Sequence, residues 1–396
     1  MSFWGFAWGF AALSLAVGFK NGFQEFDFQW DPAKLLAMGD NPYPYSLEHK
    51  AIPYEGFMQK YIDANQVPSC LLLLLPFTFL PQLLANQVWD VCNLFFTAVF
   101  LLYLYKSFFE GRAVADRFVW VALLFLSGTP LRELLGAGQH LMFSFAFFMP
   151  AYYYSTKGRW TLSGVLLALS AFKYTTIAPM AFIFLFRRWW RPVLIAVVLH
   201  LVATIGCGLY IHESPFVLVV QSLKVGAGLT AGGACDLASL MRQIGLDQYR
   251  TIWATIYYVV FSGLLVGLLF MKKRDDLLSL SLLGVISSVM FYHRSYDFVV
   301  LVFPLALVLV NKGNETQPFR ILKWVVYIMI FWAFYGMRIL YQFDIRLIGV
   351  DFALMHALLV ALLVCFTREA EAESMIGLPN LHPTNGIDDS ADGVSI

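Results

Sequence analysis

The sequence has few charged residues for its length. Only 13% of the 396 residues are Asp, Glu, Lys or Arg, whereas 59% are hydrophobic. Soluble domains carry about 25% charged residues, and no soluble fold of this size hides so much apolar side chain. The composition therefore excludes a soluble enzyme and predicts a protein that crosses a membrane several times.

Several chemical signatures are also missing. The five cysteines show no Cys-x-x-Cys spacing and most fall in apolar runs, which favours buried thiols over metal ligands or disulfides. No Walker loop, zinc-ligand spacing, catalytic serine motif or haem motif occurs. The net charge of +1 gives no electrostatic reason to expect nucleic acid as a partner. We therefore expect no resident cofactor and no nucleic-acid partner.

What the sequence does contain is a series of apolar runs. Their continuity favours helices over β-barrel strands, which alternate apolar and polar residues. We expect an all-α polytopic membrane protein with about twelve transmembrane helices over 1–366, and a disordered acidic cytoplasmic tail over 367–396. The expected spans are Phe3–Phe19, Pro68–Pro81, Val88–Tyr105, Phe118–Leu131, Leu141–Tyr154, Leu162–Phe186, Val193–Ile211, Ile252–Met271, Leu277–Tyr292, Phe298–Val310, Ile321–Tyr341 and Val350–Phe366.

Basic clusters predict the orientation. Arg187-Arg188-Trp189-Trp190-Arg191 and Lys272-Lys273-Arg274 belong in the cytoplasm by the positive-inside rule. Other basic residues in the first half fit this orientation only if Pro68–Pro81 does not cross the membrane and Leu162–Phe186 is a broken hairpin. Lys173 and Pro179 lie in the middle of that segment, which favours a break.

The first polar loop, 20–67, holds the candidate catalytic residue Asp27. Its neighbours Phe26, Phe28 and Trp30 would partly desolvate the carboxylate. Desolvation raises the pKa of a carboxyl group and makes it a better proton acceptor. Asp27 is therefore the first candidate for a general base.

The same loop also predicts a short helix. Asp31 suits an N-cap, Pro32 the first helical position and Gly39 the C-terminal stop. Such a helix would lie in the membrane interface with its leucines facing the lipid. Asp31 and Trp30 are alternatively candidates for binding a sugar or acceptor, and Asp27 with Asp31 leaves room for one divalent cation.

Three further polar groups fall within or between apolar runs. His293, Arg294 and Asp297 separate two runs, Lys173 lies inside another, and Gly138-Gln139 begins a helix. Charges so deep in a membrane protein are usually paired or functional, and a helix N-terminus favours anions. A satisfied helix-end cluster, a lysine that reaches the interface and simple turn chemistry are the structural alternatives.

These pieces, in this order, resemble glycosyltransferase family 87, whose members have a GT-C fold and use polyprenyl-phosphate sugars. The resemblance covers about Phe26 to Leu307. The matching stretches are Asp27-Phe28-Gln29-Trp30, Leu35 to Tyr43, Trp89 to Leu94, Gly138-Gln139, Gly164 to Lys173, Arg187-Arg188-Trp189 and His293 to Pro304.

The resemblance implies a membrane mannosyltransferase at the outer face of a bacterial inner membrane. Its donor would be a polyprenyl-phosphate hexose and its acceptor a lipid or glycan hydroxyl, with inversion at the anomeric carbon. We assign catalysis to Asp27 and His293, and donor-phosphate binding to a set of four residues: Lys173, Arg294, Gln139 and Gly138. Asp31, Trp30 and Asp297 are assigned to the acceptor or sugar.

Two other classes of function are compatible with the composition. A transporter or flippase for a lipid-linked or small substrate also has broken helices and charges near the membrane midplane. It predicts inverted internal repeats, which the sequence does not show. A non-catalytic membrane subunit is the third alternative.

Overall fold

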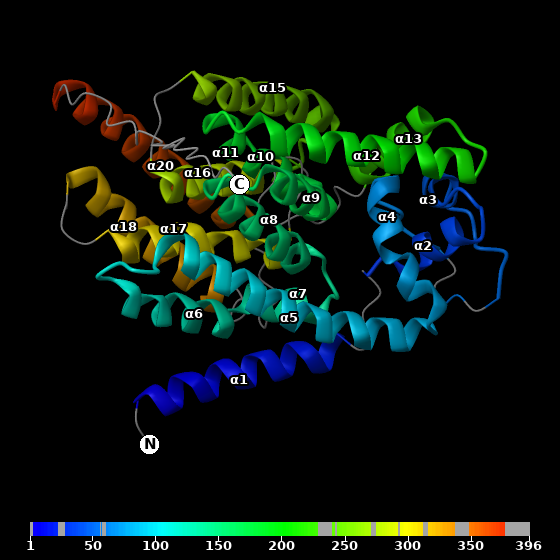
Figure 1. The fold of residues 1–396 in the computed structure, drawn as a ribbon, viewed down its shortest axis with the longest axis horizontal. Coiled ribbons are helices and arrows are strands. Elements are labelled where there is room, and N and C mark those ends of the chain that lie inside the picture. Colours follow the sequence, from blue (N-terminus) through cyan, green and yellow to red (C-terminus); the bar gives the residue numbers. More distant parts are fainter. Residues whose placement is uncertain are drawn as a thin grey trace, which may run out of the picture.

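The computed structural model describes residues 3–22, 28–55, 57, 61–228, 240–241, 244–270, 275–291, 294–311, 316–336 and 348–376. Within these ranges every regular element is a helix, as the composition predicts. Most long helices run along the long axis of the molecule. A small lobe made of α2, α3 and α4 lies at one end, beside α12 and α13 (Figure 1).

The helix boundaries divide the chain into three parts. The first contains α1 (Phe3–Gly22), α2 (Trp30–Ala37), α3 (Tyr43–Leu47), α4 (Pro68–Leu74), η1 (Leu75–Phe79) and α5 (Gln82–Phe108). The second contains η2 (Ala115–Arg117), α6 (Phe118–Ser127), α7 (Thr129–Gly136), α8 (Leu141–Thr156), α9 (Trp160–Ser170), η3 (Ala171–Lys173), α10 (Tyr174–Met180), α11 (Phe182–Phe186), α12 (Trp190–Tyr210) and α13 (Pro215–Gly228). The third contains η4 (Asp247–Tyr249), α15 (Arg250–Leu269), α16 (Asp276–Met290), η5 (Ser295–Leu301), α17 (Val302–Val310), α18 (Gln317–Phe331), η6 (Trp332–Gly336) and α20 (Ile348–Ile376).

Several helices are suited to cross a membrane. Among the described residues, five stretches are long and apolar enough: Gln82–Phe108, Trp160–Met180, Trp190–Tyr210, Gln317–Gly336 and Val350–Arg368. α6 and α7 form a sixth candidate if they are counted as one bent span. Shorter apolar helices occupy other expected positions, so the protein is a multi-pass membrane protein, and the count of about twelve spans stays a prediction.

Two expected spans differ from the sequence prediction. The stretch Phe118–Leu131 breaks at Gly128, where the chain becomes extended; α7 then begins at Thr129 with Pro130 in its first turn, and the two helices meet at 49°. The stretch expected to form a broken hairpin, 162–186, overlaps Trp160–Met180, which is a single candidate span. Within this span the α-helix is interrupted by the short 3-10 turn η3. At its end the backbone N–H of Lys173 donates to Ser144 Oγ at 2.9 Å.

The short helix of the first polar loop forms close to where it was predicted. It begins two residues earlier than expected, so Asp31 lies in its first turn, and Gln29 is the N-cap with φ of 63°. Gly39, with φ of 88°, ends it as predicted. Leu35 and Leu36 are buried in a cluster with residues of α3, α4, α12 and α13. The leucines therefore face protein, and the expectation that they face lipid was wrong.

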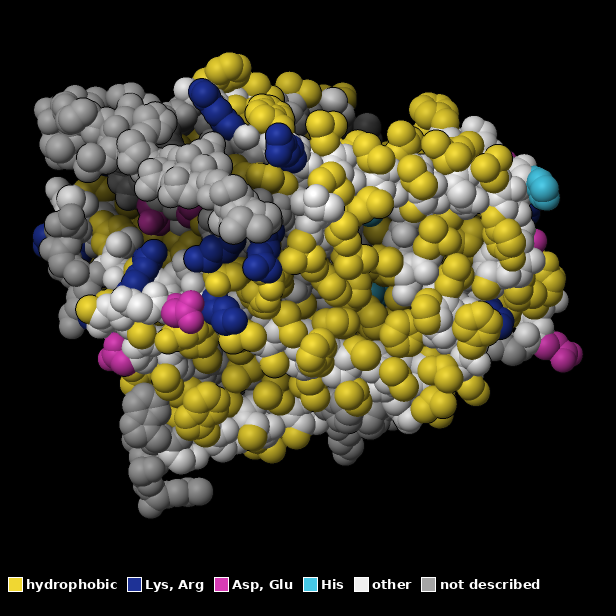
Figure 2. All heavy atoms as spheres, in the orientation of Figure 1, with side chains coloured by type: hydrophobic (Ala, Val, Ile, Leu, Met, Phe, Trp, Pro, Cys, Tyr) yellow, Lys and Arg dark blue, Asp and Glu magenta, His cyan; other side chains and the backbone are white. Residues whose placement is uncertain are grey.

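The centre of the bundle is formed by α16 and α17. Every residue from Leu277 to Met290 is buried, as are Val302 to Val308. In contrast, α12 exposes a row of apolar side chains that includes Leu194, Val198 and Leu209. Figure 2 shows hydrophobic side chains over most of the visible face, with Lys and Arg gathered mainly in its left half. This surface suits contact with lipid.

The C-terminal helix α20 continues to Ile376. The expected boundary between a membrane domain ending at Phe366 and a disordered tail over 367–396 therefore falls inside this helix. Residues 377–396 lie outside the described part of the chain. The division of the chain at that point stays a prediction.

Candidate active site

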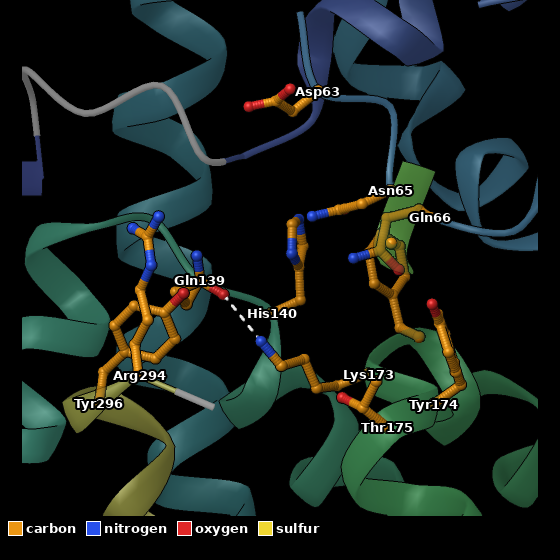
Figure 3. Close-up of a pocket in the computed structure, with 12 residues that line it drawn as sticks. Asp63, Asn65, Gln66, Gln139, His140, Lys173, Tyr174, Thr175, Arg294 and Tyr296 are labelled. Carbon is orange, nitrogen blue, oxygen red and sulfur yellow. Dashed lines mark hydrogen bonds between the residues drawn. The ribbon is translucent and has the colours of Figure 1, made fainter. Parts of the chain in front are cut away.

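A cavity of about 120 Å³ lies between the α2–α4 lobe and the helical bundle. The segment 61–66, which connects α3 to α4, forms one wall. The other walls come from the turn between α7 and α8, from η3 with the start of α10, from Gly226 of α13, and from the start of η5 (Figure 3). Segments from three distant parts of the sequence thus meet around one small polar space.

Lys173 is the cation at the centre of this cavity. It ends η3, and its Nζ lies 3.3 Å from Asp297 Oδ1 and donates to Gln139 Oε1 at 3.3 Å. The side chain of Lys173 is 15% exposed, whereas that of Asp297 is 2% exposed. The ion pair compensates the buried carboxylate, and the amide oxygen of Gln139 adds no net charge. An anion that entered the cavity would meet a positioned ammonium group.

Arg294 and Asp297 belong to the start of η5. The backbone N–H of Arg294 donates to Asp297 Oδ2 at 3.1 Å, which fixes the carboxylate in the first turn. Asp297 also forms an ion pair with Lys173. The side chain of Arg294 lines the cavity and supplies a second cation (Figure 3).

Gly138 and Gln139 form the turn between α7 and α8 rather than the first turn of a helix. Their backbone N–H groups donate to Leu135 and Leu134 carbonyls at 3.2 and 3.1 Å, so these donors close α7. Gly138 has φ of 59°, and its carbonyl accepts a hydrogen bond from Trp89 Nε1 at 2.9 Å. Gln139 therefore contributes its side chain, and Gly138 its turn geometry, to the cavity.

His140 is a cavity residue that sequence reasoning missed. It is the N-cap residue of α8 and 1% exposed, and its ring stacks on Phe172 with centroids 4.3 Å apart. Burial lowers the pKa of His140 to about 3, and the charge of Lys173 acts in the same direction. The ring is therefore neutral near pH 7. Its Nε2 lies 2.9 Å from the carbonyl oxygen of Phe28, so the neutral ring donates there.

Phe28 links the first polar loop to the cavity. Its side chain is 1% exposed and stacks on Trp89 at 4.8 Å between centroids. Asp27 and His293, the expected catalytic residues, lie outside the described residues. Of the residues that follow them in the chain, Arg294 lines the cavity, and the carbonyl of Phe28 bonds the cavity residue His140.

Trp30 and Asp31 do not line this cavity. Trp30 Nε1 donates to the Phe77 carbonyl at 3.1 Å, and Asp31 Oδ2 accepts from Gln82 Nε2 at 3.2 Å. Burial raises the pKa of Asp31 to about 6, and the hydrogen bond from Gln82 opposes part of that shift. Both side chains thus have a hydrogen-bond partner within the protein, whereas Asp31 Oδ1 is buried without one among the described residues.

A metal site needs several His, Cys, Asp or Glu side chains close together, and here this can be judged for the described residues. No group of three or more His, Cys, Asp or Glu side chains suited to a metal ion occurs among them. Asp31 supplies one carboxylate, and Asp27 lies outside the described ranges. The ion that these two residues could share remains a hypothesis for chelation experiments.

The fold and the cavity define a multi-pass helical membrane protein with a polar, cation-lined site at the end of its bundle. The family model of glycosyltransferase family 87 matches residues 67–292, more than half of the chain. The protein therefore belongs to glycosyltransferase family 87 and is a membrane glycosyltransferase. No curated protein matches the sequence significantly.

Proposed function

We propose that the protein transfers a hexose, most simply mannose, from a polyprenyl-phosphate donor to an acceptor hydroxyl of a lipid or glycan. The reaction takes place at the outer face of a bacterial inner membrane and inverts the anomeric carbon. The observation that carries the proposal is the Lys173 ammonium, held at a small cavity at the end of an apolar bundle. A phosphate that is attached to a lipid needs such a cation close to hydrocarbon.

The proposed chemistry is a single displacement. Asp27 takes the proton of the acceptor hydroxyl while that oxygen attacks the anomeric carbon. The bond between this carbon and the phosphate oxygen breaks, and its electron pair leaves with the polyprenyl phosphate. A positioned general base contributes about 10²–10⁴ in rate. The position of Phe28 supports this role for Asp27, because Phe28 is anchored to His140 at the cavity.

The developing charge on the leaving phosphate needs stabilisation. Lys173 and Arg294 line the cavity and are the two cations that we assign to this task, with the amide of Gln139 beside them. His293 is assigned to orient Asp27 or the phosphate. Asp297 positions Lys173 through its ion pair, which replaces the acceptor-binding role first expected of it.

The membrane arrangement is part of the proposal. About twelve spans over 1–366 would place the first polar loop, and with it the cavity, on the outer face. The basic cluster Arg187 to Arg191 would lie in the cytoplasm, as would the tail over 367–396. Reaction without a bound metal is the simplest scheme, and transfer that persists in a chelator would support it.

The test compares two Asp→Asn variants of the same loop. Native membranes containing the protein are incubated with radiolabelled polyprenyl-phosphate mannose, and labelled product is measured. Asp27→Asn should abolish transfer while the protein still inserts into the membrane. Asp40→Asn is the matched control, because Asp40 accepts a hydrogen bond from Tyr54 and does not line the cavity.

Full activity of Asp27→Asn would remove the central role of this residue. Passage of the labelled lipid across the membrane without formation of a new bond would instead identify a transporter or flippase. Product formed equally well from glucose and mannose donors would leave the mechanism intact but contradict the assignment of mannose.

A further inference from the structure

The segment 61–66 forms a rigid wall of the cavity although it has no helix or strand. Ile62 and Ala64 are buried in the lobe, and the backbone N–H of Ala64 donates to Ser46 Oγ at 2.7 Å. The Tyr43 hydroxyl donates to the backbone carbonyl of Gln66 at 2.8 Å. Because the backbone is held from the lobe side, the side chains of the remaining residues are presented to the cavity.

Three of these side chains line the cavity. Asp63, Asn65 and Gln66 face the space around His140 and above Lys173 (Figure 3). Asn65 Oδ1 and Gln66 Oε1 are buried and have no hydrogen-bond partner among the described residues, and Gln66 is only 7% exposed. Buried polar atoms in folded proteins are almost always paired. Because Asn65 and Gln66 line a cavity that a small molecule can enter, their two acceptors are available to a ligand that brings hydrogen-bond donors.

The cavity has two chemically different sides. Lys173 and Arg294 offer cationic donors on one side, and a carboxylate with two carboxamides lies on the other. Carboxamides accept from and donate to hydroxyl groups, and a carboxylate accepts from them. A ligand that fits both sides carries a phosphate next to several hydroxyls.

We infer that Asp63, Asn65 and Gln66 bind the ring hydroxyls of the donor's hexose, while Lys173 and Arg294 hold the phosphate to which that hexose is attached. This inference rests on the proposed function. The donor's sugar fits better than a sugar of the acceptor, because its ring is joined directly to the phosphate and so must lie beside the same two cations. A volume of about 120 Å³ also lies below the roughly 300–1,000 Å³ of pockets for drug-sized ligands, which suits one ring rather than an oligosaccharide.

The experiment measures binding rather than turnover. Purified full-length protein in detergent is titrated with polyprenyl-phosphate mannose, with polyprenyl-phosphate glucose and with bare polyprenyl phosphate. Gln66→Met keeps the length and volume of the side chain and leaves its backbone bond to Tyr43 intact. We expect this variant to bind the preferred sugar-bearing lipid about tenfold or more weakly than the wild type does. Its affinity for bare polyprenyl phosphate should fall less than about twofold.

Two variants at other positions serve as controls, and a second substitution of Gln66 tests its acceptor oxygen. Lys173→Met should lower the affinity for the sugar-bearing lipid and for the bare lipid to a similar extent, because both carry the phosphate. Gln221→Met, on α13, removes an amide that accepts a hydrogen bond from Asn41 and does not line the cavity. It should leave every affinity within about twofold of the wild type. Gln66→Glu retains acceptor oxygens and should bind the sugar-bearing lipid better than Gln66→Met.

The outcomes separate the inference from the proposed function. If the wild type binds the sugar-bearing lipid tightly and Gln66→Met binds it equally well, the sugar subsite is wrong and the proposed function stands. If Gln66→Met lowers the affinity for both lipids equally, the segment 61–66 contacts the phosphate, and the proposed sugar subsite is also wrong. If the wild type binds none of the three lipids, the proposed function itself fails.

Discussion

Among the described helices, two charged clusters differ in what surrounds them. The cavity cluster consists of Lys173, Asp297 and Gln139. The closed cluster consists of Arg187, Asp276 and Tyr152, in which both Arg187 and the Tyr152 hydroxyl donate to the Asp276 carboxylate. The exposed fraction of the cation is similar, 15% for Lys173 and 17% for Arg187.

Burial alone therefore does not distinguish the two clusters. Asp276 also lies in the first turn of α16, where the helix dipole stabilises a carboxylate, and no member of the closed cluster lines the cavity. Lys173, in contrast, faces a space whose far wall carries unpaired acceptors. We infer that the closed cluster stabilises the bundle, whereas the cavity cluster serves a ligand.

The largest expected effect is on the stability of the closed cluster. Arg187→Met leaves the Asp276 carboxylate without its cation, and breaking a buried pair costs about 3–5 kcal/mol. The apparent Tm of the purified protein in detergent should fall clearly, while transfer per folded molecule is retained. Lys157→Met, at an exposed position, should change Tm very little. An unchanged Tm for Arg187→Met would contradict the structural role.

Removal of both charges sharpens this result. Arg187→Met combined with Asp276→Leu leaves no unpaired charge, so it should recover part of the lost Tm. Transfer per folded molecule should again resemble that of the wild type.

The next effect concerns activity at the cavity cluster. Lys173→Met should lower kcat/KM for the donor by about 10²–10³, as expected for loss of one group that stabilises a developing charge. It should also lower Tm, because Asp297 loses its cation. Addition of Asp297→Asn should recover Tm but not transfer. If the double variant regains transfer, the two clusters have the same structural function.

Composition was sufficient to predict the class of fold. The apolar runs predicted helices, and Gly39 was identified correctly as the end of α2. The breaks were harder to predict, because they depend on neighbours. Pro179 is accommodated within α10, whereas Gly128 ends α6 where a side chain on its Cα would collide with the Phe334 ring. No local signal in the sequence distinguishes these two positions.

The site could be predicted only in part. Lys173, Arg294, Gln139 and Asp297 were singled out because polar residues in apolar runs are conspicuous, and the structure brings them together. His140 and the segment 61–66 were missed. They lie in polar stretches where a histidine or an amide attracts no notice, and only tertiary packing reveals that they are buried. The positions of Asp27 and His293 stay predictions.

A smaller effect is expected from Asp31, a buried carboxylate with an amide partner in place of a cation. Its pKa is raised to about 6 in the folded protein, against about 3.9 in unfolded chains. The folded state therefore binds more protons between these values, so this group makes the protein less stable as pH rises from about 4 to about 6, by at most about 3 kcal/mol. Asp31→Asn should remove this loss.

The measurement compares Tm at pH 5 and pH 7. The wild type should lose more Tm over this interval than Asp31→Asn does. The variant should also exceed the wild type at pH 7, provided that its amide keeps the contact with Gln82. Equal pH dependence in the two proteins would show that Asp31 is already ionised at pH 5.

The smallest predicted effect concerns His140, the neutral ring beside the cavity cluster. His140 contacts the same space as Lys173, but its contribution is the hydrogen bond to the Phe28 carbonyl, next to Asp27 in the chain. His140→Phe keeps a ring stacked on Phe172 and removes the donor. We expect kcat to fall about tenfold, roughly the value of one lost hydrogen bond, with KM for the donor unchanged. His140→Gln restores an N–H donor and should recover part of kcat. A rise in KM with constant kcat would instead place His140 in contact with the donor, and the anchoring role would be wrong.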